Sequence, residues 1–233
     1  YDFNRRFTAY VSYASIYNPN ESLDRNGNIL DPEMGNVYEL GLKGEHFNGA
    51  LYTNLAYFIT RQENFAVPDG NLVVPGTTNQ AFTTTDGVEV DGYEIELVGL
   101  LSDNWELSLG WTDFTAEDQD GEDVVVNHPR KNLKIFTSYN FSDSLGGLKI
   151  GGGVNWQSEE PKYAINPVTN VEEHIGENAR SVFELMASYK LNDQLTVQAN
   201  AYNLLDEEYI ESSWGTYTYG EPRNFVVSLN YTF

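Results

Sequence analysis

Residues 225–233, with the sequence FVVSLNYTF, decide the fold of this chain. Apolar or aromatic side chains occupy every second position, and the polar side chains of Ser228, Asn230 and Thr232 alternate with them. This period of two is typical of a β-strand that has one apolar and one polar face. In water, a long aromatic strand at the edge of a sheet would promote aggregation. The stretch therefore favours a strand whose apolar face meets lipid, although alternation alone is also compatible with an ordinary edge strand.

The same alternation occurs in nine further segments, so that ten strands are expected. In the segment 104–116, Trp105 and Trp111 share the apolar face, and Trp156 lies on the apolar face of a later segment, where we expect all three to contact lipid or its interface. Most segments have the roughly 9–11 residues that a tilted strand needs to cross a bilayer. The ten segments are 6–17, 37–46, 50–62, 88–101, 104–116, 131–141, 148–158, 179–191, 194–204 and 222–233.

The connections between these segments alternate between short and long without exception. The short turns are 47–49, 102–104, 142–147 and 192–194, and the long connections are 18–36, 64–86, 117–130, 159–178 and 206–220. Outer-membrane β-barrels have short periplasmic turns and long extracellular loops, whereas a soluble Greek-key sandwich has no reason to follow this rule. We therefore predict an all-β fold that forms part of an antiparallel transmembrane β-barrel.

Composition narrows the possible functions of the chain. Its 233 residues include 35 Asp and Glu but only 13 Lys and Arg, for a formal net charge of −22, and no Cys. Disulfides, thiolate metal sites and cysteine nucleophiles are excluded, and an acidic chain is a poor partner for nucleic acid. The long connections hold 20 of the acidic residues, which predicts a solvated rim. The run EDQDGED at 117–123 lacks the ligand spacing of a calcium loop, so we expect an acidic turn and no metal site.

Four stretches of the chain carry recognisable motifs. They are DRNG at 24–27 followed by LDP at 30–32, Gly35 and YELGLK at 38–43; GYEIE at 92–96 followed by Trp105 and Gly110-Trp111; HPR at 128–130; and NLLDEEY at 203–209 followed by GEPRN at 220–224 and YTF at 231–233. Taken together, these stretches resemble the C-terminal part of TonB-dependent outer-membrane receptors, in particular the siderophore-receptor subgroup. Singly, each motif is weak, but they occur in the order that the family has and cover essentially the whole chain.

The resemblance implies a role in the outer membrane of a Gram-negative bacterium. Receptors of this family have about 22 strands and a plugged lumen. We therefore expect residues 1–233 to be the C-terminal portion of such a barrel, with the plug domain, the TonB box and the signal peptide outside this sequence. The implied partners are a ferric siderophore as the transported ligand, the lipid bilayer with its lipopolysaccharide, and the TonB complex, which is reached through the plug. No resident cofactor is expected.

Two sets of residues are candidates for these roles. Aromatic side chains in the long loops could hold a bulky chelate, although for each one a position on the rim without a ligand is the simpler interpretation. The candidate ligand-binding residues are Phe65, Phe82, Tyr163, Trp214, Tyr217 and Tyr219. The residues of the family motifs are assigned structural roles, with Arg130 and Arg223 expected to pair with carboxylates on the rim. These are Tyr38, Glu39, Pro129, Arg130, Asn203, Asp206, Tyr209, Pro222, Arg223 and Phe233.

Two alternatives remain open on the sequence. The first is a small, self-closing outer-membrane barrel, which would be a porin or a hydrolase with a site on its rim. A hydrolase would need a base, but His46, His128 and His174 show no metal-binding spacing, and the chain has no Gly-x-Ser-x-Gly elbow. No catalytic residue is assigned, and we do not expect an enzyme. The second alternative is a soluble β-sandwich with acidic loops, which solubility without detergent would distinguish.

Overall fold

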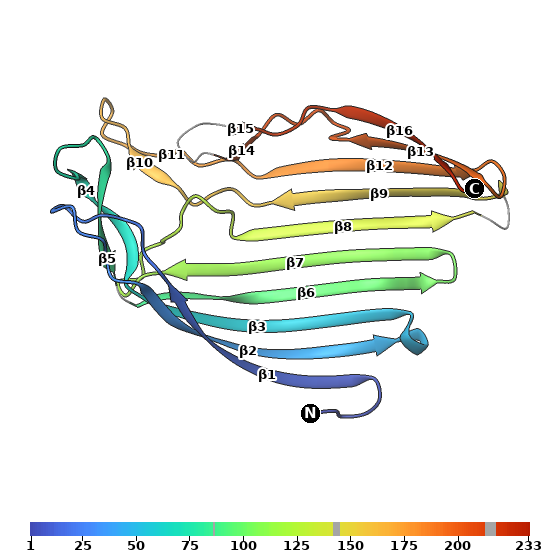
Figure 1. Cartoon of the computed structure of the whole chain (residues 1–233), viewed down its shortest axis with the longest axis horizontal. Helices are drawn as coiled ribbons and strands as arrows, with labels where there is room; N and C mark the ends of the chain where they lie inside the picture. Colours follow the sequence, from blue (N-terminus) through green and yellow to red (C-terminus); the bar gives the residue numbers. More distant parts are fainter. Residues whose placement is uncertain (86, 142–144, 213–217) are drawn as a thin grey trace.

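The computed structural model describes residues 1–85, 87–141, 145–212 and 218–233, and its main feature is one antiparallel sheet of ten strands (Figure 1). Each strand of the sheet pairs with the next one along the chain, as in a meander. The strands are β1 (Phe7–Asn18), β2 (Glu33–His46), β3 (Leu51–Glu63), β6 (Val88–Ser102), β7 (Trp105–Glu117), β8 (Lys131–Asn140), β9 (Leu148–Gln157), β12 (Arg180–Lys190), β13 (Leu195–Tyr202) and β16 (Asn224–Tyr231). The predicted fold class and all ten predicted strands are confirmed.

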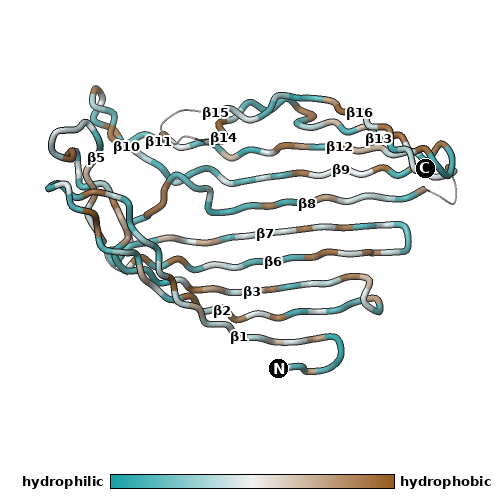
Figure 2. Tube along the Cα trace, viewed as in Figure 1, coloured by the Kyte–Doolittle hydropathy of each residue, from teal (hydrophilic) through white to brown (hydrophobic). Residues whose placement is uncertain are grey.

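The strand registers divide the side chains between an apolar and a polar face. Leu55, Ile95, Trp111, Leu133 and Trp156 are aligned across five consecutive strands on the apolar face. Large apolar side chains on this face remain widely exposed in the isolated chain. Since a soluble protein rarely exposes so extended an apolar surface, the face is the one that meets lipid. Figure 2 shows the resulting mixture of hydrophilic and hydrophobic residues along each strand.

Aromatic side chains mark the two ends of the lipid-facing band. Trp105 and Tyr139 are register partners near the short turns, and the Trp105 Nε1 donates a hydrogen bond of 2.7 Å to the Thr137 Oγ1. Near the long loops, the indole rings of Trp111 and Trp156 are stacked with their centroids 5.8 Å apart. Six residues separate Trp105 from Trp111 on β7, which is roughly 20 Å along the strand. The three tryptophans therefore lie where the sequence predicted.

The long loops contain three hairpins that the alternation pattern did not predict. They are formed by β4 (Phe65–Val73) with β5 (Gln80–Thr85), β10 (Tyr163–Ile165) with β11 (Glu172–His174), and β14 (Ile210–Ser212) with β15 (Thr218–Tyr219). Their strands are short or interrupted by Pro and Gly, so they lack a long period of two. Figure 1 shows all three hairpins at the end of the sheet opposite the short turns.

The first long loop packs on the β4–β5 hairpin. The Arg25 guanidinium forms a bidentate ion pair with the Asp69 carboxylate, with both N–O distances at 2.7 Å. The backbone N–H of Phe82 donates to the carbonyl oxygen of Leu23 at 2.9 Å. Ala81 is fully buried beside this contact. Two loops that are separate in sequence are therefore held together on the rim.

Two of the long loops use the same turn. The Asp24 carboxylate accepts hydrogen bonds from the backbone N–H groups of Asn26 and Asn28 at 2.8 and 2.7 Å, which lower its pKa to about 2. The carboxylate of Asp118 accepts equivalent bonds from Asp120 and Glu122 at 2.9 and 3.0 Å. A glycine with positive φ completes each turn, Gly27 at 86° and Gly121 at 78°. The acidic run at 117–123 is therefore a turn organised by hydrogen bonds, as predicted.

Two strands form the edges of the sheet. Within the described residues, β1 and β16 do not pair with each other, and Figure 1 shows them on opposite sides of the sheet. The chain by itself is therefore an open wall and not a closed barrel. Over the same residues, no helix is long and apolar enough to span a membrane.

Candidate functional site on the polar face and its loops

The polar face of the sheet is the surface that would line the lumen of a barrel. One register row on this face contains Glu96, Lys134 and Asn155, and Gly110 separates the first two on the intervening strand. Charged and amide groups therefore extend across the face beside the apolar row of the opposite side, and on β8 and β9 they lie near the long loops. Such groups can form hydrogen bonds with a polar ligand or with a protein segment that fills the lumen.

A cluster around Tyr10 explains part of the motif at 38–43. The Tyr10 hydroxyl donates a hydrogen bond to the Glu39 Oε1, and the Lys43 Nζ lies 4.9 Å from the centre of the Tyr10 ring. A Cβ at Gly41 would overlap this ring, so the glycine allows the tyrosine to lie flat on the sheet. Tyr38 belongs to the opposite, lipid-facing side. The motif thus alternates between a lipid contact and a polar cluster.

Two neighbouring hollows lie on the polar face near the long loops. Their volumes are about 300 and 140 Å³, and both are lined by Asn155, Val182 and Tyr209. The smaller hollow also has Lys134 in its lining, and the larger one has Glu184. Since groups of both charges surround a tyrosine ring, this part of the polar face is equipped to contact a ligand with polar and aromatic portions.

Tyr209 contacts Arg180 and the backbone of Gly220. The Arg180 guanidinium carbon lies 4.0 Å from the centre of the Tyr209 ring, and the Arg180 Nη1 donates a hydrogen bond of 2.7 Å to the Ile210 carbonyl oxygen. A Cβ at Gly220 would overlap the ring. The backbone N–H of Gly220 also donates to the carbonyl oxygen of Tyr209 at 2.9 Å. The ring is fixed in place by a cation–π contact and a glycine.

Asn203 ties the end of β13 to the segment that leads into β16. Its Nδ2 donates to the carbonyl oxygens of Glu207 and Glu221 at 2.8 and 2.9 Å, and its Oδ1 accepts from the Glu207 N–H at 2.8 Å. The side chain is almost completely buried and adopts a φ of 47°, which asparagine tolerates better than most residues. Nearby, the Asp206 Oδ1 accepts from the Arg223 N–H at 2.9 Å. The motif at 203–209 and 220–224 therefore connects the end of β13 to the start of β16 through hydrogen bonds.

Arg130 occupies an enclosed position where the third long loop joins β8. Its side chain is 12% exposed, and its Nη2 lies 3.3 Å from the Asp123 Oδ1. The guanidinium also lies over the Phe114 ring, 5.4 Å from its centre. Pro129 immediately precedes it, and the Arg130 N–H donates to the Ser158 Oγ at 3.1 Å. Both arginines of the motifs thus have a carboxylate partner, since the Arg223 Nη2 lies 3.5 Å from the Asp206 Oδ2.

The motif prolines lie just before two strands of the sheet, and the motif phenylalanine lies at the end of the chain. Pro129 and Pro222 precede the first paired residues of these strands, Lys131 and Asn224. Pro222 was expected at the start of the last strand, and the ladder begins two residues later because proline cannot donate a hydrogen bond. Phe233 is fully exposed, and its ring meets that of Tyr231 edge-on at 5.2 Å.

The structure distributes the candidate loop aromatics over separate hairpins. Phe65 and Phe82 lie in the β4–β5 hairpin, and their register partners, Thr85 and Pro68, place them on opposite faces of it. Within the described ranges, no ring contact joins any two of Phe65, Phe82, Tyr163 and Tyr219. The structure therefore does not gather them into one site.

The exposed members of this set extend from the outer hairpins. Tyr219 is 71% exposed and Tyr163 is 53% exposed, and the ring of Tyr163 meets that of His174 edge-on. Trp214 and Tyr217 lie outside the described residues.

Two of the three histidines form hydrogen bonds. The His46 Nε2 is 3.0 Å from the Thr53 Oγ1, and the His174 Nε2 is 2.7 Å from the Glu160 carbonyl oxygen. In the part of the chain that the structure describes, no group of three or more acidic or histidine side chains is arranged to hold a metal ion.

Sequence reasoning missed the two hollows. Lys134 and Asn155 lie on the polar side of their alternating segments, so strand parity could have placed them there. The contact between Arg180 and Tyr209 joins a strand to a loop 29 residues later, and no local pattern predicts it.

A family model described as "TonB dependent receptor-like, beta-barrel" matches residues 1–204. The chain belongs to this family. Its members are outer-membrane barrels, whose wall has one face toward lipid and one face toward the lumen. The two faces of this ten-stranded sheet agree with that arrangement. It is a family of receptors, in agreement with the family resemblance found in the sequence.

Named relatives are siderophore receptors. The ferripyoverdine receptor of Pseudomonas aeruginosa is 34% identical over all of this chain and 29% of its own length. The ferrioxamine B receptor of Salmonella typhimurium is 25% identical over the whole chain and 33% of its own length. The chain thus spans about a third of the length of the relatives that it matches.

Solved structures give the same result. The pyoverdine outer membrane receptor of Pseudomonas aeruginosa, bound to pyoverdine, matches with a TM-score of 0.84 and 31% identity over 100% of this chain and 35% of that one. The alcaligin outer membrane receptor of Bordetella pertussis matches with a TM-score of 0.70 and 31% identity over 99% of this chain and 35% of that one.

Proposed function

We propose that this chain is the C-terminal part of the barrel of an outer-membrane receptor that binds and imports a ferric siderophore. The observation that carries the proposal is the two-faced sheet, which superposes along its whole length on a receptor bound to pyoverdine, with a TM-score of 0.84. In this proposal residues 1–233 supply barrel wall and ligand-capturing loops. The open edges of β1 and β16 pair with the other strands of the receptor, since unpaired backbone groups are costly in lipid.

The proposed partners follow from this assignment. The ferric siderophore is a transported ligand and not a resident cofactor. TonB energises import through a plug domain that belongs to another part of the receptor, and the bilayer and its lipopolysaccharide surround the apolar face. The chain contributes binding and passage, with no catalytic chemistry of its own.

The acidic rim restricts the charge of the ligand. With a net charge of −22, most of it on the loops, the entrance repels anionic chelates unless cations compensate. This favours a neutral or cationic ferric chelate. The ligands named for relatives are pyoverdine, ferrioxamine B and alcaligin, and they form the first set to test.

The test is equilibrium binding to the detergent-purified receptor that contains this chain, followed by the quenching of tryptophan fluorescence. The ferric forms of pyoverdine, ferrioxamine B and alcaligin are titrated beside their iron-free forms. We expect at least one ferric chelate to bind, and Tyr209→Ala to weaken its binding about tenfold or more because a polar-face aromatic contact is lost. Tyr139→Ala, on the lipid-facing side, is the matched control and should bind as the unmodified receptor does. Failure of all three ferric chelates to bind more tightly than their iron-free forms would refute the proposal for this set.

A further inference from the structure

The two hollows beside Tyr209 on the polar face carry opposite charges. The smaller hollow, of about 140 Å³, is lined by the cationic side chains of Lys134 and Arg180 and by three amide side chains. Over the described part of the chain, its lining includes no carboxylate. It is therefore a locally cationic surface in a chain whose formal net charge is −22. Such a surface favours a carboxylate or another anionic oxygen group.

The larger hollow, of about 300 Å³, has the opposite character. Its lining contains the carboxylates of Glu184, Glu211 and Glu221 and, among the described residues, no Lys or Arg side chain. Asn155 and Tyr209 line both hollows, so the two adjoin each other. Carboxylates favour an ammonium group, and the Tyr209 ring at the shared boundary can contact the carbon skeleton between two charged groups.

The charged side chains nearest to this boundary are not neutralised by neighbours. Within the described ranges, Lys134 and Arg180 form no ion pair with a carboxylate, and Glu184 forms none with a cation. The Arg180 guanidinium lies over the Tyr209 ring and donates through Nη1 to the Ile210 carbonyl oxygen. The opposite charges of the two hollows are therefore both available to a bound molecule.

Strand register explains why these charges do not meet. Lys134, Asn155 and Val182 form one row across β8, β9 and β12. On β12, Arg180 and Glu184 lie two residues to either side of Val182. Four residues of strand span roughly 13 Å, and two strand spacings, roughly 10 Å, separate Lys134 from β12. The cations and the carboxylate thus lie on either side of a neutral row, and a ligand that bridges the row can contact both.

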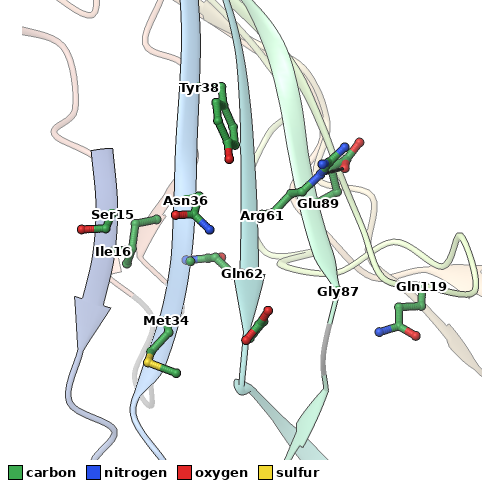
Figure 3. A pocket seen from close by; sticks show the side chains of 12 residues that line it. Ser15, Ile16, Met34, Asn36, Tyr38, Arg61, Gln62, Gly87, Glu89 and Gln119 are labelled. Carbon is green, nitrogen blue, oxygen red and sulfur yellow. Dashed lines mark hydrogen bonds and ion pairs between the residues drawn. The ribbon is translucent and has the colours of Figure 1, made fainter. Parts of the chain in front are cut away.

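A larger cleft elsewhere in the molecule shows the other arrangement. It lies at the long-loop ends of β1, β2, β3 and β6, and its lining includes Arg61 and Glu89 (Figure 3). The Arg61 Nε donates to the Glu89 Oε2 at 2.6 Å, and Figure 3 shows the two side chains directed toward each other. The cation of that cleft is therefore already paired within the wall, whereas the charges of the two hollows are held apart.

The acidic rim further restricts the charge pattern of the ligand. A chelate with a net negative charge is repelled at the entrance, whereas a chelate with equal positive and negative charges is neutral overall and is not repelled. Such a chelate still forms charge-assisted hydrogen bonds in both hollows. A ligand with a single charge uses only one of them.

We propose that the two hollows form a dipolar subsite for a zwitterionic portion of the ferric chelate, with an anionic oxygen group beside Lys134 and Arg180 and an ammonium group beside Glu184. The inference rests on the proposed function and deepens it, because it names the charge pattern of the ligand. Lys134 and Glu184 are then the residues that determine specificity for the two charged groups.

The test uses the detergent-purified receptor that contains this chain and one linear ferric trihydroxamate prepared with four different end groups. The end groups are an acetamide, an ammonium, a carboxylate, and an amino acid group that carries an ammonium and a carboxylate together. Binding is followed by the quenching of tryptophan fluorescence, with the iron-free form of each probe beside it. We expect the zwitterionic probe to bind about tenfold or more tightly than the acetamide probe.

Two neutral variants separate the contributions of the hollows. Lys134→Gln should weaken the binding of the carboxylate and zwitterionic probes about tenfold and leave the ammonium probe unchanged. Glu184→Gln should weaken the ammonium and zwitterionic probes and leave the carboxylate probe unchanged. Loss of folding cannot produce these opposite patterns. Lys190→Gln, at the short-turn end of the same strand, is the matched control and should bind all four probes as the unmodified receptor does.

Three results would contradict the dipolar subsite. Equal binding of all four ferric probes by the unmodified receptor would overturn it and leave the proposed function standing. A variant of Lys134 or Glu184 that weakens all four probes equally would also overturn it, because the hollows would then support the fold or the plug and not the end group. If no ferric probe bound more tightly than its iron-free form, import of this class of chelate would be refuted, and the subsite with it.

Discussion

At the scale of single residues, the family motifs form contacts that connect a loop to the strands beside it. Tyr209 is enclosed by the Arg180 guanidinium, 4.0 Å from its ring, and by the bare backbone of Gly220. Asn203 supplies three hydrogen bonds to the same region. These residues determine where the last long loop leaves the wall, and so they position the hollows beside Asn155.

Replacing Gly220 with alanine should therefore displace the Tyr209 ring. We expect a loss of about 1–3 kcal/mol of stability, because the added methyl group overlaps a ring that is also in contact with Arg180. Thermal unfolding of the detergent-purified receptor measures the effect. Gly110→Ala is the control, since a Cβ there meets no atom within 4 Å, and it should leave the unfolding midpoint nearly unchanged. Equal midpoints for the two variants would contradict this account of Gly220.

At the scale of elements, the loops are ordered by local turns and by contacts with each other. The turn at Asp24 is closed by two backbone N–H groups, and the neighbouring Arg25 joins this loop to Asp69 of β4. Alternation predicted none of this, because a turn has no period and a contact between loops is not local in sequence. The three hairpins in the loops escaped prediction for the same reason.

The order of the Asp24 turn should depend on pH. Its folded pKa of about 2 is lower than the usual value near 4, so the carboxylate stabilises the turn above pH 4 and the stabilisation is lost as the pH falls toward 2. We expect the backbone amides of Asn26 and Asn28 to become less protected from hydrogen exchange over this interval, after correction for the intrinsic rate. In Asp24→Ala, protection should already be low at pH 5. An unchanged pH dependence in this variant would assign the effect to another group.

The ion pair between Arg25 and Asp69 should couple the two loops. Asp69 is 14% exposed and Arg25 is 58% exposed, so we expect a coupling energy of about 0.5–1 kcal/mol. A double-mutant cycle with Arg25→Ala and Asp69→Ala, read by protease cleavage of the β4–β5 hairpin, measures it. The exposed pair of Lys190 and Asp193 provides a reference cycle that should give a smaller value. Additive effects of the two exchanges would show that the pair does not hold the loops together.

At the scale of the whole molecule, the wall has one lipid-facing side and two free edges. The two edges are β1 and β16, and neither has a partner beyond the sheet among the described residues. In lipid, each unpaired backbone group costs several kcal/mol, so the wall requires further strands. The fold therefore supports a part of a larger barrel more strongly than a small barrel that closes on itself.

Gel migration of the isolated chain in detergent micelles, with and without boiling, tests this conclusion. We expect no faster band in the unboiled sample and a tendency to form oligomers, because ten strands in this arrangement leave both edges open. A compact, fast-migrating unboiled band would show that β1 and β16 can pair, and it would revive the self-closing alternative.

The sequence by itself determined the strands, their order and the face of each side chain. The alternation of Trp105, Glu106 and Leu107 specifies outward and inward positions within one strand, and a period of two needs no knowledge of distant residues. Parity also assigns Lys134 and Asn155 to the polar face. The sequence likewise predicted an acidic turn at Asp118, because turn residues act locally.

Only the tertiary structure decided which loops and side chains meet. It brought Arg180 to Tyr209 and Arg25 to Asp69, and it kept the candidate aromatics Phe65, Tyr163 and Tyr219 apart. These contacts depend on strand register and on the direction in which each loop leaves the sheet. Both are set by pairings between residues far apart along the chain, which no local pattern contains.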